Sequence, residues 1–112
     1  MHESTLGLVV VGYSELSSPA RHLVGVGDEL YAGCDDGGVL VFHERSSQVI
    51  RRFSSPVTAL GADRNTLVFG SLHGVGEVRD RQHRSPVTTF DHGQPITAVH
   101  ADGHLTAVAA GS

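Results

Sequence analysis

The sequence predicts an all-β fold made of repeated, four-stranded antiparallel units. Short runs of β-branched and aromatic residues are closed by Gly, Asp and Asn, which is typical of strands joined by tight turns. No 3.6-residue apolar periodicity of helical length occurs. Short motifs also recur at similar intervals, which indicates an internal repeat. They are Ser-Pro at 18–19 and 55–56, Pro-Val-Thr-Ala-Leu at 56–60 against Pro-Ile-Thr-Ala-Val at 95–99, and Gly-Ser at 70–71 and 111–112.

The first half of the chain is predicted to hold one complete unit. Residues 1–18 are apolar and β-prone in their middle, and we expect them to be the end strand or strands of an incomplete unit. Residues 19–55 form the first full unit. Its expected strands are 20–26, 29–33, 39–43 and 48–53. The continuous apolar run at 39–42 is expected of a strand covered on both faces, and Arg51 and Arg52 suit an outer edge strand.

The second unit, residues 56–94, repeats this order with a weaker third strand. Its expected strands are 57–60, 66–69, 74–79 and 87–90. The third strand alternates polar and apolar residues and carries two glycines, and residues 81–85 are expected to be a polar connection.

The third unit, residues 95–112, is expected to hold only its first hairpin. Asp102-Gly103 stands between two apolar runs, which predicts a two-residue turn with positive φ at both positions. Such a turn would pair Ala101 with His104.

Composition and charge exclude several classes of protein. The formal charge is −4, with scattered acids and no basic run, which does not favour binding to nucleic acid or to a membrane surface. Cys34 is the single cysteine, so no internal disulfide is predicted, and we expect it to be a small buried residue. No apolar stretch is long enough for a transmembrane helix, and the N-terminus lacks the basic start of a signal peptide. We therefore expect a cytoplasmic protein.

The order of these motifs resembles the WD40 repeat over roughly residues 19–112. The resemblance implies that each unit is a four-stranded blade of a β-propeller. About two and a half units cannot close a ring, which takes roughly four to eight blades. The expected fold is therefore a partial WD40-like propeller, completed by further blades of a longer chain or by self-association. Other propeller families, a small β-sandwich and a swapped dimer remain as alternatives.

The units depart from the family pattern at several positions. In that family His, Ser or Thr, Asp and Trp of one blade form a buried hydrogen-bond chain, and no unit here holds the complete set. We therefore expect these units to depend mainly on apolar packing. The matching residues are Asp36, Gly37, Ser71 and Asp80, whereas Phe42, His43, His73 and Arg79 replace family residues.

The resemblance implies that partners bind one rim of the propeller. That rim is made by the turns between second and third strands and by the connections into each first strand. Leu72 stands out, because it is an apolar residue in a polar turn; the alternative is that it packs against a neighbouring unit. The predicted partner-binding residues are Asp35, Asp36, Leu72, His73, Asp91 and His92.

No catalytic, cofactor or metal site is predicted. The eight histidines show no repeated ligand spacing, and a single cysteine does not support a tetrahedral metal site. No Gly-x-Ser-x-Gly motif occurs. The Gly-Val-Gly motifs at 25–27 and 74–76 lack both a third glycine and a following helix, so they are interpreted as turn residues.

The sequence therefore predicts a non-catalytic protein–protein interaction scaffold. Its expected partners are other protein subunits of a larger complex, with no nucleic acid and no membrane. The alternative is a ligand-binding or enzymatic propeller whose channel is completed by other blades. The residues expected to face that channel, at 21–22, 58–59 and 97–98, are mostly small and neutral, which favours a structural axis.

Overall fold

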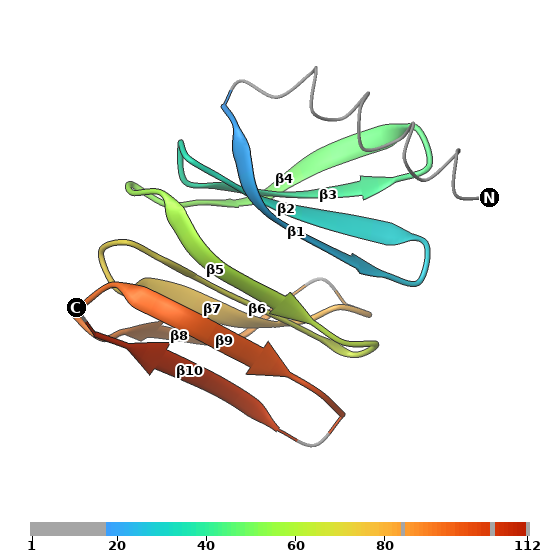
Figure 1. Cartoon of the computed structure of the whole chain (residues 1–112). Coiled ribbons are helices and arrows are strands. Elements are labelled where there is room, and N and C mark those ends of the chain that lie inside the picture. The colour runs from blue at the N-terminus through green and yellow to red at the C-terminus, as the bar shows by residue number, and fades with distance from the viewer. Residues whose placement is uncertain (1–17, 84, 104, 112) are drawn as a thin grey trace.

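The computed structural model describes residues 18–83, 85–103 and 105–111 as three antiparallel sheets with no helix (Figure 1). The all-β class and the four-stranded antiparallel sheets are confirmed. The described sheets do not close into a ring, and residues 1–17 with their expected strand lie outside the described residues. The strands are β1 (Ala20–Val26), β2 (Glu29–Cys34), β3 (Gly38–His43), β4 (Ser46–Arg52), β5 (Val57–Ala62), β6 (Thr66–Ser71), β7 (Val75–Asp80), β8 (Ser85–Asp91), β9 (Ile96–Ala101) and β10 (Thr106–Ala110).

Each sheet is a meander in which neighbouring strands follow one another in the chain. The first sheet has the order β1-β2-β3-β4, the second has β5-β6-β7-β8, and the third pairs β9 with β10. The sheets stack on one another, and the first strands β1, β5 and β9 are neighbours across the stack (Figure 1). No helix in the described part of the chain is long and apolar enough to cross a membrane.

The main core lies between the first and second sheets. Alternate residues of a strand share one face, so Tyr31 on β2 and Val39 and Val41 on β3 point together towards the second sheet. They meet Leu67 and Phe69 of β6, all of them buried. On the opposite face of β3, Phe42 is also buried, at 4% exposure, as expected for a strand covered on both faces.

The same interface also buries a carboxylate, which the sequence analysis did not expect. Glu77 on β7 is 2% exposed. Its Oε2 lies 2.9 Å from Arg51 Nε, and its Oε1 lies 3.5 Å from Arg79 Nη1. A buried charge is tolerated when it is paired, and here two guanidinium groups face it. The interface is therefore apolar and ionic together, where mainly apolar packing was expected.

Arg81, expected in a polar connection, lies inside this interface with its side chain 11% exposed. Its Nη2 lies 3.0 Å from Glu29 Oε1, and its Nε donates to the Tyr31 hydroxyl at 3.0 Å. Its Nη1 donates to the Asp63 carbonyl, also at 3.0 Å. One side chain thus joins the first sheet to the turn between β5 and β6.

Two glycines set how closely successive sheets approach. A Cβ on Gly33 would stand 2.6 Å from Val57 Cγ1, and a Cβ on Gly70 would stand 2.6 Å from Ile96 Cβ. Val57 and Ile96 begin the repeated motif at 57–60 and 96–99. Each first strand therefore rests on a glycine of the sheet before it, and the repeat in sequence is a repeat of this contact.

The turn in the third sheet differs from the predicted one. Ala101 pairs with Thr106, so the expected pairing of Ala101 with His104 and the two-residue Asp102-Gly103 turn are wrong. The Asp102 N–H donates to the Leu105 carbonyl, and Asp102 Oδ1 accepts from the Leu105 N–H, both at 2.9 Å. Asp102 is thus the first residue of the turn, because its carboxylate accepts a hydrogen bond from the backbone N–H at the other end of the turn.

The expected match of Gly-Ser at 70–71 with 111–112 is also out of register. The Gly111 N–H donates to the Pro95 carbonyl at 3.0 Å, as the Leu72 N–H does to the Pro56 carbonyl at 2.9 Å. Gly111 therefore holds the place of Leu72, and Ala109 holds that of Gly70. Ser112 lies outside the described residues.

We predict that Gly70→Ala lowers the free energy of unfolding by about 1–3 kcal/mol, because the added methyl overlaps Ile96 between two packed strands. Urea unfolding followed by circular dichroism measures the change. Gly25→Ala is the matched control, since its Cβ would meet nothing closer than 4.0 Å. Equal losses in the two variants would contradict the close-contact explanation.

We predict that stability falls as the pH rises above about 10. Burial, reinforced by the hydrogen bond to Glu29, raises the pKa of Tyr31. The folded state thus holds this proton more tightly than the unfolded state. Its contribution is complete below the unfolded pKa and is lost as the pH rises through the folded pKa. Urea unfolding between pH 9 and 12 should show a shallower decline in Tyr31→Phe than in the original chain; identical slopes would refute the assignment.

Candidate functional site

The predicted partner-binding residues lie at one end of the sheets, in turns that backbone bonds hold together. We call residues 35–37, 72–74 and 91–94 the turn rim. The Phe53 N–H donates to the Gly37 carbonyl at 2.8 Å, and the His92 N–H donates to the Gly74 carbonyl at 3.0 Å. Each turn between second and third strands is therefore tied to the connection that leads into the next sheet.

The first rim turn joins β2 to β3. The Gly37 N–H donates to the Cys34 carbonyl at 3.1 Å, and Gly37 has a φ of 91°. A Cβ at this position would collide with the Phe53 carbonyl oxygen, so glycine is required for space as well as for conformation. The Asp36 N–H donates to Ser18 Oγ at 2.9 Å. The serine before the first Pro thus caps the turn.

The second rim turn, between β6 and β7, repeats this geometry. The Gly74 N–H donates to the Ser71 carbonyl at 3.1 Å, and Gly74 has a φ of 95°. The His73 N–H donates to Ser55 Oγ at 3.1 Å, and Ser55 is 5% exposed. The serine of the recurrent Ser-Pro motif therefore caps a rim turn. The sequence analysis noted the repeat of Ser-Pro but did not identify this role.

The third part of the rim is the connection from β8 into β9. Asp91 Oδ1 accepts from the Gly93 N–H at 2.9 Å, and Gly93 has a φ of 69°. The rings of Phe90 and His92 lie 5.3 Å apart between centroids. Gln94 stands where Ser18 and Ser55 stand in the other two connections.

The charges of the rim are unevenly distributed. Asp35 lies 3.0 Å from Arg21 Nε, and Asp36 lies 2.8 Å from Arg52 Nη1, so an arginine compensates each acid of the first turn. The second turn instead presents Leu72, which is 44% exposed. Almost half of the Leu72 side chain is therefore accessible within the described part of the chain. His73, Asp91 and His92 are exposed beside it.

The six residues predicted for partner binding all lie in turns or connections at the same end of the sheets. Asp35 and Asp36 lie on the first rim turn, Leu72 and His73 lie on the second, and Asp91 and His92 lie in the connection bound to that second turn. The rim offers one exposed apolar side chain among polar groups, on backbone that serine caps and positive-φ glycines hold in place.

The described residues give little support for a thiol nucleophile or a metal site. Cys34 is 1% exposed, and burial, with the nearby Asp36 carboxylate, raises the pKa of its thiol, which opposes the thiolate form that a nucleophile needs. No three His, Cys, Asp or Glu side chains of residues 18–83, 85–103 and 105–111 gather where they could hold a metal ion.

The structure is similar to the crystal structures of two computationally designed proteins, Ika8 and Ika4. Each comparison has a TM-score of 0.73 and 23% sequence identity over 85% of this chain. This chain covers 31% of the Ika8 chain and 62% of the Ika4 chain, which is less than two thirds of either. No protein-family model and no curated protein match the sequence. The similarity shows the fold alone.

We predict that Ser55→Ala loosens the second rim turn. The substitution leaves the His73 N–H without its acceptor, which costs about 1 kcal/mol. Amide hydrogen exchange at His73, followed by NMR, should become about fivefold faster. Ser54→Ala is the control, because Ser54 is the exposed neighbour. Unchanged exchange at His73 would show that the serine does not hold this turn.

Proposed function

We propose that the chain is a non-catalytic scaffold for protein–protein contacts that uses the turn rim as its partner surface. The observation that carries this proposal is that the turns holding the six predicted residues lie at the same end of the sheets. Leu72 is exposed at the centre of this rim, on a turn held by Ser55 and Gly74. Exposed side chains on loops that a rigid sheet positions are a common arrangement for recognition.

We further propose that the sheets are blades of a partial WD40-like propeller in the cytoplasm. Two features support this. Successive meanders stack with their first strands adjacent, and the same glycine contact recurs at both sheet junctions. In Ika8 and Ika4 the matched fold is also part of a longer chain. Further blades, from a longer chain or from other copies, would then complete a ring, and other protein subunits would bind the rim.

The alternative, an enzymatic or ligand-binding channel along the first strands, has less support. Thr58 Oγ1 donates to the Ile96 carbonyl at 2.5 Å, and Thr97 Oγ1 donates to the Ala109 carbonyl at 3.2 Å. Arg21 is paired with Asp35. These polar side chains of the first strands serve the backbone and the rim, which favours a structural axis.

We predict that Leu72→Glu reduces capture of protein partners at least tenfold, because a charge replaces the apolar contact at the rim centre. Affinity capture from cell extract with quantitative mass spectrometry measures the change. Leu105→Glu is the matched control: Leu105 is 56% exposed and lies in the turn at the opposite end of the third sheet. Equal loss in both variants, or specific capture of a small molecule without protein, would contradict the proposal.

A further inference from the structure

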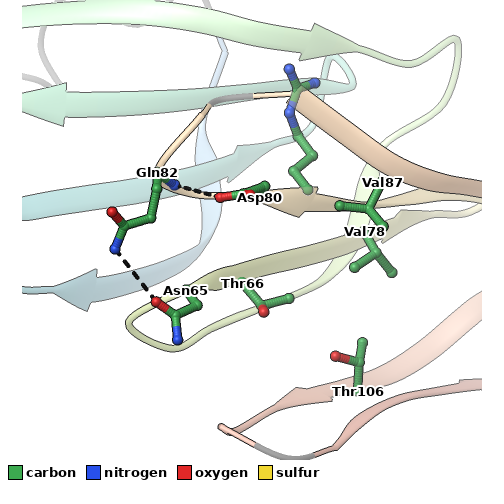
Figure 2. A pocket seen from close by; sticks show the side chains of 8 residues that line it. Asn65, Thr66, Val78, Asp80, Gln82, Val87 and Thr106 are labelled. Carbon is green, nitrogen blue, oxygen red and sulfur yellow. Dashed lines mark hydrogen bonds between the residues drawn. The ribbon is translucent and has the colours of Figure 1, made fainter.

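A groove of about 410 Å³ lies between the second sheet and Thr106 of β10 (Figure 2). The polar side chains at one end of it bind one another. The Gln82 N–H donates to Asp80 Oδ1 at 2.8 Å, and Gln82 Nε2 donates to Asn65 Oδ1 at 3.4 Å (Figure 2). These bonds fix the neighbouring turns and do not indicate a ligand. A hydroxyl without such a partner lies at the opposite end of the sheets, in the connection from β4 into β5.

Two arginines precede the serines of this connection. Arg51 and Arg52 stand three and two residues before Ser54. Arginines at these two positions are the charge pattern that arginine-directed protein kinases select, because acidic groups in their peptide site pair with the guanidinium groups. Ser54 is the only serine of the sequence with both arginines at these spacings, although Ser55 also has Arg52 three residues before it. The sequence alone thus leaves two candidate serines.

The structure distinguishes the two serines. Ser55 is 5% exposed, and its Oγ accepts from the His73 N–H at 3.1 Å, so a phosphate there would displace the cap of the second rim turn. Ser54 is exposed, and its hydroxyl has no hydrogen-bond partner among the described residues. A phosphate on Ser54 therefore breaks no side-chain bond that the structure shows.

The arginines before Ser54 are accessible to a second acidic partner. Both lie on β4, the outer strand of the first sheet, and their side chains are 41% and 52% exposed. Arg51 Nε lies 2.9 Å from Glu77 Oε2, and Arg52 Nη1 lies 2.8 Å from Asp36 Oδ2. A guanidinium group has five N–H donors, so each arginine keeps donors for a carboxylate of a kinase.

The exposure of Ser54 is set by parts of the fold that the structure describes on both sides. The Phe53 N–H donates to the Gly37 carbonyl of the first rim turn at 2.8 Å, and Ser55 Oγ binds the second rim turn at His73. Ser54 thus lies between these two turns. Blades added beyond the third sheet would not cover it, because the second sheet stands between.

We propose that Ser54 is a phosphorylation site for an arginine-directed protein kinase, and that its phosphate weakens partner binding at the turn rim. In the modification, the Ser54 Oγ attacks the γ-phosphorus of ATP. The new bond from Oγ to phosphorus forms as the bond from phosphorus to the bridging oxygen of the β-phosphate breaks. ADP leaves, and the hydroxyl proton passes to a carboxylate base of the kinase.

The effect on the rim follows from charge. A phosphoserine carries about −1.5 to −2 charges at neutral pH. The nearest cation along the chain, Arg52, already binds Asp36, so it compensates the added charge only in part. The Leu72 N–H bonds to the Pro56 carbonyl, two residues after Ser54, so the phosphate stands beside the exposed apolar residue of the rim. A charge at an apolar contact surface opposes binding. This consequence rests on the proposed scaffold function, whereas the modification itself does not.

The test incubates the full 112-residue chain with ATP and the catalytic subunit of cyclic-AMP-dependent protein kinase as the arginine-directed probe. Tandem mass spectrometry locates the phosphate. A synthetic peptide of residues 48–60 is the unfolded reference. We expect one phosphate on Ser54, with a kcat/KM for the folded chain within about tenfold of that for the peptide, because the site is exposed in the fold.

Matched variants separate the site from its neighbours. Ser54→Ala should abolish the modification, and Ser55→Ala should retain it. Arg52→Gln should lower kcat/KM by about tenfold or more, because one charged contact with the kinase is lost. Arg45→Gln is the control, since Arg45 is an exposed arginine in the turn between β3 and β4, away from Ser54.

Three results would overturn the proposed modification: a phosphate on the peptide with none on the folded chain, a phosphate on Ser55, or equal rates for the original chain and Arg52→Gln. The consequence is measured by affinity capture, in which the phosphorylated chain should retain Leu72-dependent partners at least about threefold less than the unmodified chain. Equal capture would refute the effect on the rim. Phosphorylation of Ser54 without any Leu72-dependent capture would show that the scaffold function fails while the modification stands.

Discussion

The close approach of each first strand to a glycine of the preceding sheet is the contact on which the architecture depends. At Gly33 and Gly70 no side chain separates the two backbones, so Val57 and Ile96 seat directly on the sheet before them. This brings β1, β5 and β9 together while the outer strands spread apart. Small residues are needed on the side where the first strands meet. On the side where the outer strands spread apart, there is room for larger and charged side chains.

The spreading side explains the buried ions between the first two sheets. Glu77, Arg79 and Arg81 stand at alternate positions, so they share the face that points to the first sheet. Arg81 also lies over the Tyr31 ring, 5.6 Å from its centroid. A guanidinium group spans a wider gap than an aliphatic side chain and keeps its hydrogen bonds there. This pairing is particular to one junction, since the first sheet has Leu40 and Phe42 at the places of Glu77 and Arg79.

Local pattern was enough to predict the strands and the four-stranded order, because β-branched runs and turn residues act over a few positions. It was not enough where the position of a residue depends on a contact with a residue far away in the sequence. Arg81 looked like a loop residue, since Glu29 and Tyr31 lie about fifty positions away. The Asp102 turn depends on whether its carboxylate accepts a backbone bond or its backbone turns through positive φ, and both fit the same dipeptide. The capping role of Ser55 could not be predicted either, because it depends on where the second rim turn lies in the folded chain.

The two junctions between the three sheets differ in how many buried contacts stabilise them. The junction of the first two sheets combines an aromatic core with paired ions, whereas β9 and β10 offer mainly Ile96 to the core and are otherwise largely exposed. In a linear array each sheet is held only by its junctions with its neighbours. Of the two junctions among the described residues, the one between the second and third sheets is therefore expected to open before the one between the first and second.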